Sequence, residues 1–219
     1  MKALNLYFDH TILKPEATKD QVEALCQEAK EHHFFSVCVN SCYVELAAKL
    51  LEGSDVKIAA VVGFPLGACT TETKAFETDQ ACALGAAEVD MVLNVGMFKS
   101  GEKEFCKNDI KAVVEAAAKH DAIVKVILET CLLSDEEIVE ACKISEEAGA
   151  QFVKTSTGFG AAGATAHHVK LMKETVGNRL EVKASGGIRD YKTTMEMIEA
   201  GADRIGASAG VAIMEEFSQ

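Results

Sequence analysis

The sequence predicts a single α/β domain over residues 1–219, folded as a closed (β/α)8 TIM barrel. Short apolar runs alternate with amphipathic runs eight times along the chain, which is typical of parallel strands joined by helices. No low-complexity linker or shift in composition divides the chain, and eight units in 219 residues suit one compact barrel. A doubly wound open sheet is the alternative that this alternation allows.

Eight segments rich in β-branched and apolar residues are expected to form the strands. They are Leu6–His10, Phe34–Asn40, Lys57–Gly63, Glu88–Val95, Ile123–Thr130, Phe152–Thr157, Glu181–Ser185 and Arg204–Ser208.

The segments between the strands are expected to be helical. Thr18 is suited to cap the first of them, and Ser134 with Glu137 has the spacing of a capping box. The expected helices are Thr18–His33, Ser41–Leu51, Glu72–Leu84, Lys103–Lys119, Ser134–Ala148, Thr165–Val176, Tyr191–Ala200 and Val211–Phe217.

Composition limits the partners and the compartment. The formal net charge is −12, so the chain has no general electrostatic attraction for nucleic acid or anionic membranes, and any anion site must be built locally. The eight cysteines show no C-x-x-C pair and no zinc-type spacing with histidine, which favours free thiols in a reducing cytoplasm. The amino-terminal segment lacks the apolar core of a signal peptide.

Lys154 lies in the middle of a segment that reads as a buried strand, "QFVKTSTGFG". The two-residue period of a strand places Lys154 on the opposite face from Val153, and Lys183 in "EVKASGG" opposite Val182. A lysine pressed against the helices would be hard to solvate, so both ammonium groups are expected to point into the barrel. The same two-residue alternation places the Asp90 side chain of "EVDMVLNVG" inside the barrel.

Two lysines and one carboxylate that converge inside a barrel favour a catalytic site over a purely structural ion-pair network. Desolvation and a second ammonium group both lower the pKa of a lysine, and a neutral amine adds to carbonyl groups to form a Schiff base. A buried ion-pair network with no catalytic role is the alternative for these three residues.

Glycine-rich turns follow the last strands, "SGGIR" at 185–189 and "GASAG" at 206–210. Barrels often bind phosphate in the loops after strands 7 and 8, where glycine allows backbone N–H groups to approach the anion. Asp9, in "FDHT", ends the first strand and could pair with a central lysine or simply stand in a turn. Cys38, without a paired base, is expected to be a wall of the pocket.

Together, "FDHT", "EVDMVLNVG", "VKTSTGF", "VKASGGIR" and "RIGASAG" resemble the deoxyribose-phosphate aldolase family in order and position, from about Asp9 to Gly210. The resemblance implies a lyase that needs neither metal nor cofactor. It would reversibly cleave 2-deoxy-D-ribose 5-phosphate, by Schiff-base chemistry, to D-glyceraldehyde 3-phosphate and acetaldehyde, in the breakdown of deoxynucleosides. It also implies a homo-oligomer, a dimer or tetramer, with small-molecule partners.

The resemblance assigns roles to individual residues. Lys154 would be the Schiff-base lysine, Lys183 the lysine that perturbs it, Asp90 the carboxylate that relays protons, and Asp9 its support. The residues expected to contact the substrate or its phosphate are Thr157, Gly158, Gly186, Gly187, Gly206 and Ser208, with Cys38 in the pocket wall.

One position departs from the family pattern. Some members carry a lysine directly after "KTSTG", where it helps to hold the phosphate, whereas this chain has Phe159. Phosphate binding is therefore expected to depend more on backbone N–H groups. The rival functions are another Schiff-base aldolase or transaldolase with a different donor, and a non-catalytic barrel that binds phosphosugars.

Overall fold

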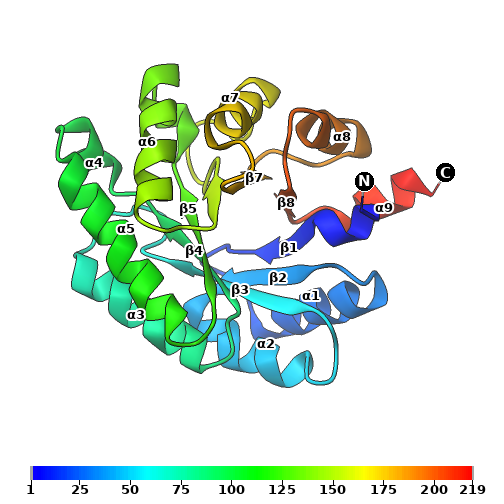
Figure 1. Ribbon diagram of the computed structural model, residues 1–219. Coiled ribbons are helices and arrows are strands. Elements are labelled where there is room, and N and C mark those ends of the chain that lie inside the picture. Colours follow the sequence, from blue (N-terminus) through cyan, green and yellow to red (C-terminus); the bar gives the residue numbers. More distant parts are fainter. Residues whose placement is uncertain (1, 219) are drawn as a thin grey trace.

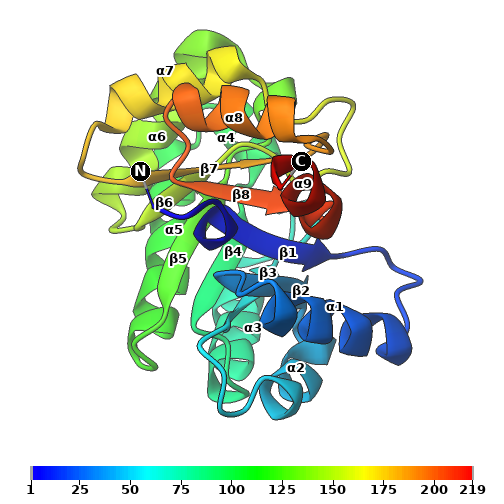
Figure 2. The ribbon, with the colours of Figure 1, turned by 90° about the vertical axis from the view of Figure 1, so that its right-hand side faces the viewer.

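The computed structural model describes residues 2–218, which form a closed barrel of parallel strands surrounded by helices (Figure 1). Each strand pairs with the next along the chain, and the last pairs with the first to close the ring. Figure 2 shows these two strands, β8 and β1, side by side. The predicted TIM barrel is confirmed, and the open-sheet alternative is wrong.

The strands are β1 (Phe8–Ile12), β2 (Ser36–Asn40), β3 (Lys57–Val62), β4 (Glu88–Val92), β5 (Ile123–Ile127), β6 (Phe152–Lys154), β7 (Glu181–Ser185) and β8 (Arg204–Ala207). The α-helices are α1 (Lys19–Glu31), α2 (Val44–Leu50), α3 (Thr71–Ala83), α4 (Val95–Lys99), α5 (Lys103–Ala118), α6 (Asp135–Glu147), α7 (Ala166–Val176), α8 (Tyr191–Glu199) and α9 (Gly210–Phe217). Short 3-10 helices are η1 (Leu4–Tyr7), η2 (Ser41–Tyr43) and η3 (Thr130–Leu132).

Most strands end before the predicted residue, and the first is shifted along the chain. The predicted strand Leu6–His10 is observed at Phe8–Ile12, since Leu4–Tyr7 form η1. The predicted strand Glu88–Val95 stops at Val92, because the Asn94 side chain accepts the Met97 N–H and starts α4, which the sequence analysis missed. The capping box of Ser134 and Glu137 is present at α6.

The barrel buries side chains in two separate regions, one between the strands and the helices and one inside the ring of strands. Between the strands and the helices lies a continuous apolar core, to which Val153 and Val182 contribute. Inside the ring, Cys38, Ala59 and Val61 of β2 and β3 form a small apolar cluster with Leu13. The charged side chains of the lumen come from the other six strands, so the charges gather on that side of the ring.

Outside the lumen, a buried ion pair connects α3 to α5. Lys74 Nζ lies 2.5 Å from Asp109 Oδ2, and both side chains are fully buried. Lys74 also donates to the Val92 carbonyl at 3.0 Å, and Thr71 donates to Asp109 at 2.8 Å. The pair therefore ties two helices to the end of β4. No helix within residues 2–218 is both long and apolar enough to span a bilayer.

Candidate active site

Asp90, on β4, is the centre of the lumen network. Its Oδ2 accepts hydrogen bonds from Lys154 Nζ at 2.8 Å and Lys183 Nζ at 2.7 Å. Its Oδ1 accepts one from Lys125 Nζ at 2.7 Å. The strand phase thus brings together the three residues that the sequence analysis singled out, from β4, β6 and β7.

Asp9, on β1, holds the opposite side of Lys183. Its Oδ2 contacts Lys183 Nζ, while its Oδ1 accepts hydrogen bonds from Ser36 Oγ and Arg204 Nη1, each at 2.7 Å. Of the two interpretations of Asp9, pairing with a central lysine is what the structure shows.

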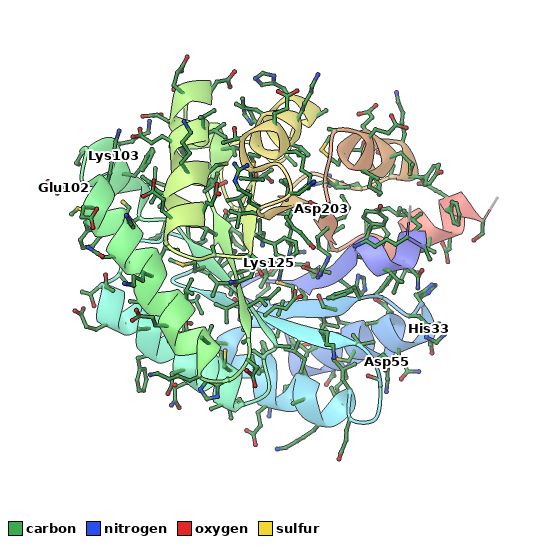
Figure 3. The ribbon with its side chains drawn as sticks, in the orientation of Figure 1. His33, Asp55, Glu102, Lys103, Lys125 and Asp203 are labelled. Carbon is green, nitrogen blue, oxygen red and sulfur yellow. The ribbon has the colours of Figure 1, made fainter. Side chains whose placement is uncertain are left out.

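Three charged residues of this network were missed by the sequence analysis. Lys125 lies 2.5 Å from Glu88 Oε2, and Glu88 lies 3.1 Å from Arg204 Nη1. Figure 3 shows Lys125 at the centre of the barrel, whereas the labelled His33 and Asp55 lie at its periphery. The segment "IVKVI" carried the same signal as Lys154, a lysine alternating with buried valines.

Four basic side chains therefore share the lumen with three carboxylates among the described residues. They are Lys125, Lys154, Lys183 and Arg204 against Asp9, Glu88 and Asp90. A buried charge without a partner is costly, so this imbalance favours one neutral base.

The directions of the pKa shifts favour Lys154 as that base, since Lys125, Lys183 and Arg204 all shift the other way. Burial lowers the pKa of Lys154, and the adjacent charge of Lys183 lowers it further against the attraction of Asp90. Burial acts on Lys183 in the same direction, but Asp9 and Asp90 together outweigh it and raise the pKa of Lys183 above its usual value. Burial opposes ionisation of Asp90, yet Lys125, Lys154 and Lys183 hold its pKa well below the usual value.

A cavity of about 380 Å³ opens at the carboxyl ends of β1, β6, β7 and β8. Lys154 is the member of the charged network that lines it, whereas Asp90, Lys183 and the others lie beneath. Within this charged network, the amine whose pKa is lowered is therefore also the one that a ligand in the cavity can reach.

Six residues expected to contact the substrate line the same cavity: Thr157, Gly158, Gly186, Gly187, Gly206 and Ser208. Cys38 is not among the lining residues; it is fully buried in the apolar side of the lumen, and burial raises the pKa of its thiol. Gly206 has a second reason to be glycine, since a Cβ there would lie 3.0 Å from Lys183 Cε.

Glu129 orders the loop that follows β6, and no sequence signal singled it out. Its buried carboxylate accepts hydrogen bonds from the backbone N–H and the hydroxyl of Thr157. The Thr157 hydroxyl in turn accepts the Phe159 N–H at 3.0 Å. Both donors of Thr157 are thus directed at Glu129, and Thr157 serves to shape the loop beside Gly158.

A TIM barrel that presents one desolvated amine to a cavity has the architecture of a class I aldolase, a lyase that works through a lysine. The sequence profile described as "DeoC/LacD family aldolase" matches residues 3–216. The chain belongs to this family of aldolases.

Individual relatives agree with this assignment. The deoxyribose-phosphate aldolase of Clostridium tetani is 63% identical over 210 residues, which cover 96% of this chain and 97% of the relative. A solved structure named QR15, an aldolase, is 43% identical, with a TM-score of 0.94 over 100% of this chain and 97% of that one. The tetrameric deoxyribose phosphate aldolase of Aeropyrum pernix is 34% identical, with a TM-score of 0.93 over 99% and 91%.

Proposed function

We propose that this chain cleaves 2-deoxy-D-ribose 5-phosphate reversibly to D-glyceraldehyde 3-phosphate and acetaldehyde, through a Schiff base on Lys154. The observation that carries the proposal is the position of Lys154: its pKa is lowered, it is held by Asp90, and it lines the cavity. The names of the relatives supply the substrate.

The first stage forms the covalent intermediate. The neutral Lys154 amine adds to the C1 aldehyde of the open-chain sugar and gives a carbinolamine. Protonation of its hydroxyl and loss of water then give the protonated imine. Asp90 and Lys183 lie within hydrogen-bond distance of each other and Asp90 contacts Lys154, so they are placed to move these protons.

The second stage breaks the carbon chain. The C3 hydroxyl loses its proton to a relay through water and Asp90, and the C2–C3 bond breaks. Its electron pair moves into the imine, which becomes an enamine, and D-glyceraldehyde 3-phosphate leaves. Protonation of the enamine at C2 and hydrolysis then release acetaldehyde and restore the Lys154 amine.

The supporting roles follow from the contacts beneath the cavity. Lys183 stays charged because Asp9 and Asp90 both bind it, so it lowers the pKa of Lys154 and polarises Asp90. Asp9 keeps Lys183 in place together with Ser36 and Arg204. The phosphate would lie in the cavity against the glycine-rich bend at 186–187 and the end of β8 at 206–208.

Reductive trapping tests the proposal. Acetaldehyde with borohydride should convert Lys154 to its ethyl derivative, found by peptide mass mapping, and Lys154→Ala should abolish both the adduct and the cleavage. Lys49→Ala, at an exposed site on α2, is the matched control and should keep both. Adducts scattered over surface lysines would contradict the Schiff base.

The same experiment separates the rivals. An aldolase or transaldolase with a different donor would not form an adduct with acetaldehyde at Lys154. A non-catalytic barrel would bind phosphosugars without any turnover, and Lys154→Arg would lose nothing.

The proposal includes a cytoplasmic homo-oligomer, a dimer or tetramer. All eight cysteines are free thiols, which suits a reducing compartment, and the Aeropyrum pernix relative is tetrameric. Light scattering coupled to size exclusion would give the mass of the assembly, and a monomer would contradict this part.

A further inference from the structure

The loop after β6 presents an aromatic side chain, Phe159, to the cavity. Phe159 stands directly after "KTSTG", is half exposed, and packs edge-on against Phe64 with ring centroids 5.3 Å apart. A dianionic phosphate bound beside this pair of rings would need its countercharge from another element.

The cavity is nevertheless electropositive. Among the described residues that line it there is no aspartate or glutamate, although the chain carries a net charge of −12. Its basic residues are Lys14, Lys154 and Arg189. Lys154 is bound to Asp90 and must be neutral to react, so Lys14 and Arg189 remain to balance an anion.

Neither of these two side chains forms an ion pair with a carboxylate of residues 2–218. Lys14 leaves β1 on one side of β8, and Arg189 follows β7 on the other side. The two cations therefore flank the end of β8 at residues 206–208, where the phosphate is expected to lie.

The backbone holds Lys14 in a fixed position. Its carbonyl accepts the Ala17 N–H at 3.1 Å across a turn that contains Pro15, whose ring restricts the preceding residue to extended conformations. Leu13 is buried on one side of Lys14, and on the other side Tyr43 donates to the Ala17 carbonyl at 2.5 Å. A lysine anchored at both ends of its turn loses little backbone entropy when it binds an anion.

We propose that Lys14 binds the substrate phosphate and supplies the charge that Phe159 cannot. Lys14 thereby determines the preference for phosphorylated over unphosphorylated sugars. The inference rests on the proposed function, because it concerns the phosphate of the same substrate.

The test compares two substrates, 2-deoxy-D-ribose 5-phosphate and 2-deoxy-D-ribose. Lys14→Ala should raise KM for the phosphorylated sugar about tenfold, which corresponds to about 1.4 kcal/mol, and change kcat less than about twofold. Its kcat/KM for 2-deoxy-D-ribose should be unchanged. Inorganic phosphate should inhibit it about tenfold more weakly than it inhibits the parent enzyme.

Two further variants distinguish loss of the Lys14 charge from general damage to the enzyme. Lys14→Arg keeps the charge and should restore most of the affinity, and Lys19→Ala, five residues away on the exposed start of α1, should behave like the parent. An equal loss with both sugars, or no change with the phosphorylated one, would overturn the role of Lys14. Failure of the proposed function itself would appear differently, as the absence of an acetaldehyde adduct on Lys154.

Discussion

Lys154 and Lys183 are register partners on β6 and β7 and share one oxygen of Asp90, yet their pKa values move in opposite directions. The difference is a second carboxylate. Lys183 also contacts Asp9, whereas Lys154 faces the cavity without another carboxylate partner among the described residues. Lys183 thus stays protonated, and its positive charge lowers the pKa of Lys154, which favours Lys154 as the nucleophile.

Replacing Lys183 should therefore make Lys154 harder to deprotonate. In Lys183→Met the repulsion between the two ammonium groups is gone, so the pKa of Lys154 should rise. The midpoint for reductive alkylation of Lys154 by acetaldehyde should move to higher pH, measured by mass spectrometry. Lys192→Met, exposed on α8, is the control, and an unmoved or lower midpoint in Lys183→Met would refute the argument.

Asp9 should stabilise the fold in a pH-dependent way. Burial opposes its ionisation, but Lys183, Lys125 and Arg204 hold its pKa below the value of an unfolded aspartate, about 3.9. Its contribution is therefore complete above about pH 4 and is lost as the pH falls through the lower, folded pKa. Asp9→Asn should lower the free energy of unfolding by about 3 kcal/mol at pH 7.

Urea denaturation at several pH values checks this prediction. The difference between the parent and Asp9→Asn should narrow as the pH falls below about 4. Asp20→Asn, on the exposed first turn of α1, should cost no more than about 1 kcal/mol at pH 7. A difference for Asp9→Asn that is constant from pH 7 to pH 3 would show that the charge of Asp9 is not what matters.

The ion pair between Lys74 and Asp109 should act on stability rather than chemistry. Lys74→Met leaves the Asp109 carboxylate buried without its cation, which costs about 3–5 kcal/mol of unfolding free energy. Lys49→Met, in the exposed pair with Glu45, should cost less than about 1 kcal/mol.

Replacing both partners, as in Lys74→Met with Asp109→Leu, should recover part of the loss because no unpaired charge remains. Equilibrium urea denaturation measures each variant, and kcat of the folded fraction should change less than about threefold. A large loss of kcat in a stably folded Lys74→Met would instead implicate the link from Lys74 to Val92, two residues from Asp90.

The eightfold alternation of apolar and amphipathic runs was enough to predict the barrel. The alternation of side chains within its strands was enough to predict the inward direction of Lys154, Lys183 and Asp90. Glu88 and Arg204 escaped notice because each is the first residue of its strand, where charged residues are usually solvated. Their burial depends on the stagger of a closed barrel, which pairs Arg204 with Lys183.

Which lysine is neutral could not be predicted from local pattern either. The answer depends on Asp9, which lies 174 residues from Lys183 in the chain and reaches it through the closure between β1 and β8. Glu129 was missed for a similar reason, because its partner Thr157 lies 28 residues away, in the loop after β6.

The charged network lies within the strands, whereas most residues that line the cavity lie in the loops after them. The loops are thus placed to bind the substrate, and the charged side chains of the strands set the reactivity of the amine. Lys154 belongs to both parts, because it is in the charged network and also lines the cavity. Substitutions in the loops can alter which aldehyde is accepted and leave the acidity of the amine untouched. An architecture of this kind lets new acceptor specificities evolve, or be selected in the laboratory, on an unchanged catalytic centre.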